Sequence, residues 1–207
     1  RSSQPLFAPL TTRATSVAAH AKGNAAMRNI AVIGAGQMGT GIAQTVAGQG
    51  MHVILADIDL AHAEAGKARV DKAVAKQVGR GKIEADAAEA LLERITPVGD
   101  YAAMESADLI IEAATEKEPI KQAIFENAGK VLSATAIMAS NTSSIPITRM
   151  ANHSPDPSRF IGLHFFNPVP VMGLIEVIPG LATAQVTTDR VTAFAEGLGK
   201  EVVLSQD

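Results

Sequence analysis

The most informative stretch of the sequence is residues 29–39, NIAVIGAGQMG, in which a short apolar run is followed by three closely spaced glycines. A run of this kind is typical of a buried strand, and a helical pattern follows over about 38–47. Gly34, Gly36 and Gly39 have the G-x-G-x-x-G spacing of a dinucleotide-binding turn. The first glycine allows the tight turn, the second lets the backbone approach a pyrophosphate, and the third lets the helix pack on the strand.

The acid that follows this turn indicates which dinucleotide binds. Asp57 ends the next predicted strand, 52–57, where its carboxylate can accept a hydrogen bond from a ribose 2′-hydroxyl and would repel a 2′-phosphate. Residues 58–60 include no Arg to hold such a phosphate. We therefore expect NAD rather than NADP, with Gln37 and Met38 at the helix N-terminus among its contacts. FAD shares the glycine spacing and stays an alternative on the motif alone.

Strand and helix patterns alternate along the rest of the chain. The predicted strands are continuous apolar runs, which are typical of a parallel sheet covered on both faces. The later strands are expected at 95–98, 108–112, 136–140, 160–164, 174–178 and 201–204, and the other helices at 60–78, 84–94, 118–131, 145–152 and 188–198. This order predicts an α/β fold of the Rossmann type, with a doubly wound and mostly parallel sheet.

The composition excludes several classes of function. The 207 residues are 47% hydrophobic and 19% charged with a net charge of −3, which excludes a disordered chain and argues against a nucleic-acid partner. There is no cysteine, so disulfides, thiolate chemistry and cysteine-based metal sites are excluded, and we expect no metal. No apolar run reaches the roughly 20 residues that a membrane-spanning helix needs, so we expect no membrane partner.

The beginning of the chain differs from the rest. Residues 1–28 contain four basic residues and no acid, a charge of +4, which leaves −7 for the remainder. This stretch is rich in Ser, Thr and Ala, so we expect residues 1–27 to be a disordered leader and residues 28–207 to form the domain. The leader resembles a transit peptide in composition, which would place the protein in the mitochondrial matrix. If it is instead an unrelated leader or an expression remnant, we expect the cytoplasm of a bacterium.

Two later segments carry candidate catalytic groups. Residues 140–144, SNTSS, leave a parallel strand at its carboxyl end, where ligands bind in open α/β sheets, although a hydroxyl here could equally cap the following helix. His164 ends the predicted strand 160–164, and Glu176 lies 12 residues later in the next strand. A histidine held by a carboxylate is suited to general acid–base catalysis. The alternative is a histidine that packs against the two phenylalanines following it.

In chain order, these motifs resemble the L-3-hydroxyacyl-CoA dehydrogenase family. The resemblance rests on GAGQMGTGIA, Asp57, IIEAATEKEPIK, ASNTSS, GLHFFNPVPVM and LIEVI, and it covers about residues 28–207. The His-Phe-Phe-Asn-Pro segment is more specific than the glycine motif, and the bacterial 3-hydroxybutyryl-CoA dehydrogenases are nearest. Membership would imply NAD-dependent oxidation of an (S)-3-hydroxyacyl-CoA, such as 3-hydroxybutyryl-CoA, to the 3-ketoacyl-CoA.

The resemblance also implies roles for individual residues. His164 matches the general base that takes the proton from the 3-hydroxyl, and Glu176 matches the partner of that histidine. Ser143 matches a residue that contacts both the substrate oxygen and the cofactor. The remaining implied cofactor contacts are Asn167 on the nicotinamide side, Glu116, and Lys121, which would also lie near coenzyme A.

Charged residues on the predicted helices have a simpler alternative interpretation. Without the resemblance, Glu116 and Lys121 would be a solvated pair at a helix start. Lys76, Arg80 and Lys82 are candidate partners for the phosphates of coenzyme A, or merely a solvated helix end.

The chain departs from the family pattern in two respects. In the family, an all-helical domain follows the nucleotide domain and supplies the dimer interface and much of the acyl pocket. We expect that domain to be absent here, and the full-length protein to form a homodimer through it. Relatives often carry Lys where this chain has Gly173. The alternative functions are an NAD-binding module without turnover, truncated or similar to a lens crystallin, and a related sugar-acid dehydrogenase.

Overall fold

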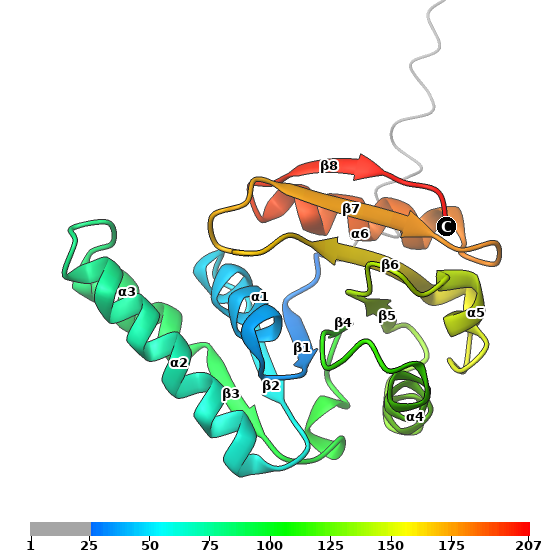
Figure 1. Ribbon diagram of the computed structural model, residues 1–207, viewed down its shortest axis with the longest axis horizontal. Helices are drawn as coiled ribbons and strands as arrows, with labels where there is room; N and C mark the ends of the chain where they lie inside the picture. Colours follow the sequence, from blue (N-terminus) through cyan, green and yellow to red (C-terminus); the bar gives the residue numbers. More distant parts are fainter. Residues whose placement is uncertain (1–25) are drawn as a thin grey trace, which may run out of the picture.

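The computed structural model describes residues 26–207, whose strands form one eight-stranded sheet (Figure 1). The strands are β1 (Asn29–Ile33), β2 (His52–Ala56), β3 (Ile95–Val98), β4 (Leu109–Glu112), β5 (Ile137–Ser140), β6 (Phe160–Phe165), β7 (Leu174–Pro179) and β8 (Glu201–Leu204). The helices are α1 (Gln37–Gly48), α2 (Leu60–Val78), α3 (Ala85–Glu93), α4 (Glu118–Gly129), α5 (Ile147–Ala151) and α6 (Gln185–Gly197), with short 3-10 turns η2 (Ala102–Met104) and η3 (Pro157–Arg159).

The sheet order is β3-β2-β1-β4-β5-β6-β7-β8. All pairs from β3 to β6 are parallel, β7 is antiparallel to β6, and β8 is parallel to β7. The chain builds outward from β1 in one direction and then returns to continue from β4 in the other. This reversal separates the loops at the carboxyl ends of β1 and β4, which is where open α/β sheets bind ligands. The predicted doubly wound, mostly parallel fold is confirmed.

Helices cover both faces of the sheet (Figure 1). On one face, α1, α2, α3 and α6 bury a cluster that includes Ile42, Val70 and Val191. On the other face, α4 and α5 bury a second cluster that includes Phe125 and Met150. Both clusters continue through side chains of the central strands, so the strands are apolar on both sides, as their sequences indicate.

Several boundaries differ from the sequence-based expectation. The segment between β6 and β7, residues 166–173, is too short for a crossover helix, so β7 returns antiparallel to its neighbour. Helix α5 is shorter than predicted, and α6 begins three residues earlier, at Gln185. Met27 is buried in the first core cluster, so the packed chain starts one residue before the expected boundary at 28. Of the predicted leader, 1–27, residues 1–25 lie outside the described residues.

No helix of residues 26–207 combines the length and the apolar character needed to cross a membrane.

Candidate active site

The glycine turn joins β1 to α1 and depends on glycine at two positions for steric reasons. Gly34 has φ +105°, and a Cβ there would lie 2.6 Å from the carbonyl oxygen of Ala113. A Cβ on Gly39 would lie 1.7 Å from the carbonyl oxygen of Gly34. Gly36 differs, because no atom lies within 4 Å of the place where its Cβ would stand. The protein therefore leaves no room for a side chain at Gly34 and Gly39, whereas the space beside Gly36 is free.

The N-terminus of α1 is free to bind an anion. Gly36 is the N-cap residue and provides no side-chain cap, so the first amide N–H groups of the helix have no intrahelical acceptor. Gly36 and Gln37 are exposed, and Met38 is half-buried against the core. Free N–H groups and the helix dipole together favour a phosphate at this position.

The Asp57 carboxylate lies at the end of β2 beside the glycine turn. Its Oδ2 accepts a hydrogen bond from the Ala35 N–H at 2.6 Å, and its Oδ1 accepts one from the Ile58 N–H at 2.7 Å. The Arg69 guanidinium donates to the carbonyl oxygen of Ala35 from α2. Because each carboxylate oxygen has two lone pairs, Asp57 can still accept from ribose hydroxyls while it holds the turn.

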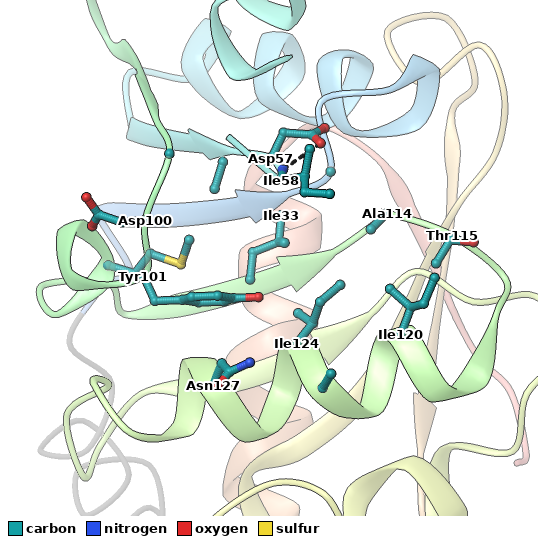
Figure 2. A pocket seen from close by; sticks show the side chains of 15 residues that line it. Ile33, Asp57, Ile58, Asp100, Tyr101, Ala114, Thr115, Ile120, Ile124 and Asn127 are labelled. Carbon is teal, nitrogen blue, oxygen red and sulfur yellow. Dashed lines mark hydrogen bonds between the residues drawn. The ribbon is translucent and has the colours of Figure 1, made fainter. Parts of the chain in front are cut away.

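A cavity of 490 Å³ opens beside Asp57, between the carboxyl ends of β1 and β2 and helix α4 (Figure 2). Its walls are largely apolar and include Ile58, Ile120 and Ile124. Tyr101 extends its ring along the cavity in Figure 2, and burial raises the pKa of its phenol. An apolar cavity next to a carboxylate and a free helix N-terminus suits the base, ribose and pyrophosphate of a dinucleotide, so these residues fit the cofactor.

His164 and Glu176 face each other across the antiparallel pair β6–β7. They are directly opposite in register, and Nδ1 of His164 lies 2.7 Å from Oε2 of Glu176. The two side chains are 18% and 30% exposed. Ser205, just after β8, donates from Oγ to the other carboxylate oxygen at 3.3 Å. The carboxylate fixes one ring nitrogen, so Nε2 is the nitrogen available to a substrate.

The alternative for His164, packing against both phenylalanines that follow it, is seen for only one of them. The ring of Phe166 lies 4.6 Å from the imidazole, centroid to centroid, at an interplanar angle of 52°. Phe165 is buried in the core cluster. The histidine therefore has one aromatic neighbour in addition to its carboxylate partner.

The polar side chains of the loop after β5 have different roles. Thr142 accepts hydrogen bonds at Oγ1 from the Ser144 and Ile145 N–H groups and donates to Oε2 of Glu116 at 2.7 Å. Thr142 is therefore the residue that supplies the local turn bonds, and Ser143 is left exposed. Buried Asn141 accepts at Oδ1 from the Phe165 N–H at 2.8 Å, which ties the loop to the strand of His164.

Lys121 is buried, which differs from the solvated helix start that is its simpler interpretation. It is 1% exposed, and its Nζ lies 2.6 Å from Oε2 of Glu112 and 3.5 Å from Oγ of Ser140. Its ammonium is enclosed by Glu112 and Ser140, and the contact with the cofactor and coenzyme A that the resemblance implies stays a prediction. The solvated pair with Glu116 is wrong, since Glu116 is exposed and bonds to Thr142 instead.

The remaining predicted contacts lie in two different places. Asn167 is exposed in the β6–β7 loop, and its Oδ1 accepts from Nε2 of Gln37 at 3.2 Å, so this loop reaches the glycine turn. The candidate coenzyme A partners are exposed residues at or near the α2–α3 turn, namely Lys76, Arg80 and Lys82. This turn lies away from the strand ends that carry the other predicted groups (Figure 1).

Sequence reasoning missed three contributors to the site. Tyr101 belongs to a segment without a recognisable motif, and Ser205 follows the last predicted strand. Asn141 was included only as part of a hydroxyl-rich segment. A buried amide directly after a strand, in a loop that already carries hydroxyls, could have singled it out.

This geometry agrees with comparisons to known proteins. A family model described as "3-hydroxyacyl-CoA dehydrogenase, NAD binding domain" matches residues 29–207. The chain belongs to this family. NAD is accordingly the cofactor of the domain, which confirms the expectation from Asp57 and the glycine turn.

Sequence relatives agree with the family model. The chain is 42% identical over 183 residues to a 3-hydroxybutyryl-CoA dehydrogenase of Bradyrhizobium diazoefficiens, covering 88% of this chain and 62% of that protein. It is 42% identical over 181 residues to a probable 3-hydroxybutyryl-CoA dehydrogenase of Bacillus subtilis, covering 87% and 63%. The chain thus spans less than two thirds of the length of these relatives.

Solved structures show the same fold. An (S)-3-hydroxybutyryl-CoA dehydrogenase from Ralstonia eutropha superposes with a TM-score of 0.86 at 38% identity, covering 88% of this chain and 64% of that one. A 3-hydroxybutyryl-CoA dehydrogenase from Escherichia coli gives 0.85 at 39% identity, with 88% and 39% covered.

Proposed function

We propose that the protein containing this domain oxidises (S)-3-hydroxyacyl-CoA thioesters, such as 3-hydroxybutyryl-CoA, to 3-ketoacyl-CoA with NAD. The observation that carries the proposal is the His164–Glu176 pair, which lies on strands whose loop contacts the glycine turn through Asn167 and Gln37. The printed names of the relatives support the same substrate class.

In this mechanism His164 is the general base. Its Nε2 takes the proton of the 3-hydroxyl while the hydrogen on C3 leaves as hydride, so the C3–oxygen bond becomes a carbonyl. Glu176 holds Nδ1–H and stabilises the imidazolium that forms. NAD, when bound, supplies the hydride acceptor.

The other residues bind and orient the reactants. Asp57 is proposed to accept from the adenosine ribose, and the free N–H groups of residues 36–38 to bind the pyrophosphate. Ser143 is exposed and is proposed to donate to the substrate oxygen, and Asn167 to contact the nicotinamide side. Glu116 is proposed to reach the cofactor from the opposite loop. Homodimerisation through the family's helical domain stays a prediction.

The direct test is an assay of the whole protein with acetoacetyl-CoA and NADH, followed by the loss of NADH absorbance. We expect turnover with the thioester and little with free acetoacetate. Competition by free coenzyme A would support thioester recognition, whereas efficient reduction of a keto sugar acid without such competition would contradict it.

The second candidate is an NAD-binding module without turnover. It is favoured by one observation, that the family model matching residues 29–207 describes an NAD binding domain. The same assay on residues 1–207 distinguishes the two: NADH binding without turnover supports the module for this chain, and turnover at the rate of the whole protein excludes it.

A further inference from the structure

The described residues contain one ion pair in which both side chains are buried. It joins Lys121 of α4 to Glu112 at the end of β4, and the two side chains are 2% and 0% exposed. The other ion pairs of residues 26–207 all include at least one side chain that is a quarter or more exposed, or a histidine. A buried ion pair is weak evidence for stability, because apolar residues of similar size often serve as well. Stability alone therefore does not explain why an ion pair lies at this position.

The Glu112 carboxylate accepts three hydrogen bonds, each from a different segment. Oε2 accepts from Lys121 at 2.6 Å and from Oγ of Ser140 at 2.9 Å. Oε1 accepts from the N–H of Ala114 at 2.9 Å. One carboxylate thus fixes helix α4, the end of β5, and the first part of the β4–α4 loop.

The bonded segments lead to the two sides of the site. Ala114 lines the cavity beside Asp57. On the other side, Ser140 Oγ accepts from the N–H of Thr142 at 3.4 Å, in the loop that presents Ser143. The cluster of Glu112, Lys121 and Ser140 is buried behind both loops and does not line the cavity.

We propose that Lys121 is a positioning residue: through Glu112 and Ser140 it holds the cavity wall at Ala114 and the Ser143 loop in fixed relation. This proposal rests on the proposed function, because the relation matters only if one ligand contacts both loops. Lys121 acts through Glu112. Its positive charge is the counter-charge that allows an ionised carboxylate, with two acceptor oxygens, to be buried at this position.

The hydrogen-bond inventory gives a sharp test. Lys121→Met leaves a buried carboxylate without its counter-charge. Glu112→Gln leaves one acceptor oxygen for two donors, Lys121 and the Ala114 N–H. In the double variant, the new glutamine amide can accept from Ala114 and donate to Ser140, and no buried charge is left without its counter-charge. The two changes together should therefore be milder than either alone.

The experiment measures two properties of the folded protein in the wild type, both single variants and the double variant. One is amide hydrogen exchange in residues 113–116 and 141–144, and the other is the Kd for NADH. Lys117→Met is the matched control, since Lys117 is an exposed lysine at the start of the same helix. We expect each single variant to exchange faster and bind NADH more weakly by about tenfold, with recovery to within about threefold in the double variant.

Lowered melting temperature with unchanged exchange and unchanged NADH affinity would overturn the proposal, because that is the result of a purely structural ion pair. If Lys121→Met does not fold, failure of the double variant to recover relative to Glu112→Gln overturns it equally. If wild-type protein does not bind NADH, the proposed function fails, and the exchange rates still decide whether Lys121 holds the two loops.

Discussion

Two carboxylate pairs at the carboxyl edge of the sheet have nearly the same nitrogen–oxygen distance and differ in burial. Lys121 and Glu112 are 2.6 Å apart with side chains 2% and 0% exposed, and His164 and Glu176 are 2.7 Å apart with side chains 18% and 30% exposed. The first pair is buried and bonded to protein groups. The second has one ring nitrogen directed away from its carboxylate and enough exposure to exchange a proton. The difference in burial, more than the distance within each pair, distinguishes the proposed positioning pair from the proposed catalytic pair.

The same contrast extends to the two parts of the sheet. Among the parallel strands β1, β2, β4 and β5, the candidate binding groups come mainly from loops and from the backbone at a helix N-terminus. In the antiparallel pair β6–β7, they are strand side chains that face each other in register. This arrangement predicts that changes in the first part alter cofactor affinity, whereas changes in the second alter turnover.

The largest expected effect is on turnover. His164→Ala in the whole protein should lower kcat by about two orders of magnitude or more, the usual contribution of a general base, with the NADH Kd within about twofold of wild type. His153→Ala is the matched control, because His153 also pairs with a carboxylate, Glu126, at 3.1 Å. Equal loss in both variants, or unchanged kcat in His164→Ala, would break the comparison.

A smaller effect is expected on cofactor affinity. Gly36→Ala should fold normally, because its Cβ meets no atom within 4 Å, but should weaken NADH binding by about tenfold where the phosphates approach. Gly34→Ala should instead lower the free energy of unfolding by about 1–3 kcal/mol, because φ is +105° and the Cβ would meet Ala113. Isothermal titration and thermal unfolding of both variants measure the two effects. Normal NADH affinity in Gly36→Ala would contradict this assignment.

The smallest effect concerns the choice of dinucleotide. Asp57→Ala should reduce the preference for NADH over NADPH by about fivefold to tenfold, the usual net contribution of one hydrogen bond. Asp59→Ala is the control, since Asp59 caps α2 through the His62 N–H and does not line the cavity. Tight NADPH binding to the wild type would show that the carboxylate does not select between the cofactors.

The sequence predicted those features that depend on neighbouring residues. The glycine turn, Asp57 and the strand ends are local patterns, and the strand ends agree with the structure to within one residue. The His164–Glu176 pair was predicted from a histidine at the end of one strand and a glutamate within the next. The short segment 166–173 could also have indicated the antiparallel turn that places them opposite each other.

Other features depend on contacts between distant segments. Lys121 follows an exposed isoleucine in a polar helix start, and only the packing of α4 on the ends of β4 and β5 encloses its ammonium. The cavity wall at Tyr101 likewise depends on where the β3–β4 connection crosses the sheet. Thr142 and Ser143 have similar side chains, and tertiary contacts decide which one bonds to its own loop.

The central claim is that one NAD molecule lies along the carboxyl edge of the sheet from the cavity to His164. The most direct measurement is the change in amide and imidazole NMR signals when NADH is added to this chain. The account predicts changes in residues 34–39, at Asp57 and Ala114, and in the His164 ring, with little change at the α2–α3 turn. Changes confined to the α2–α3 turn, or a His164 ring that does not respond while the glycine turn does, would contradict it.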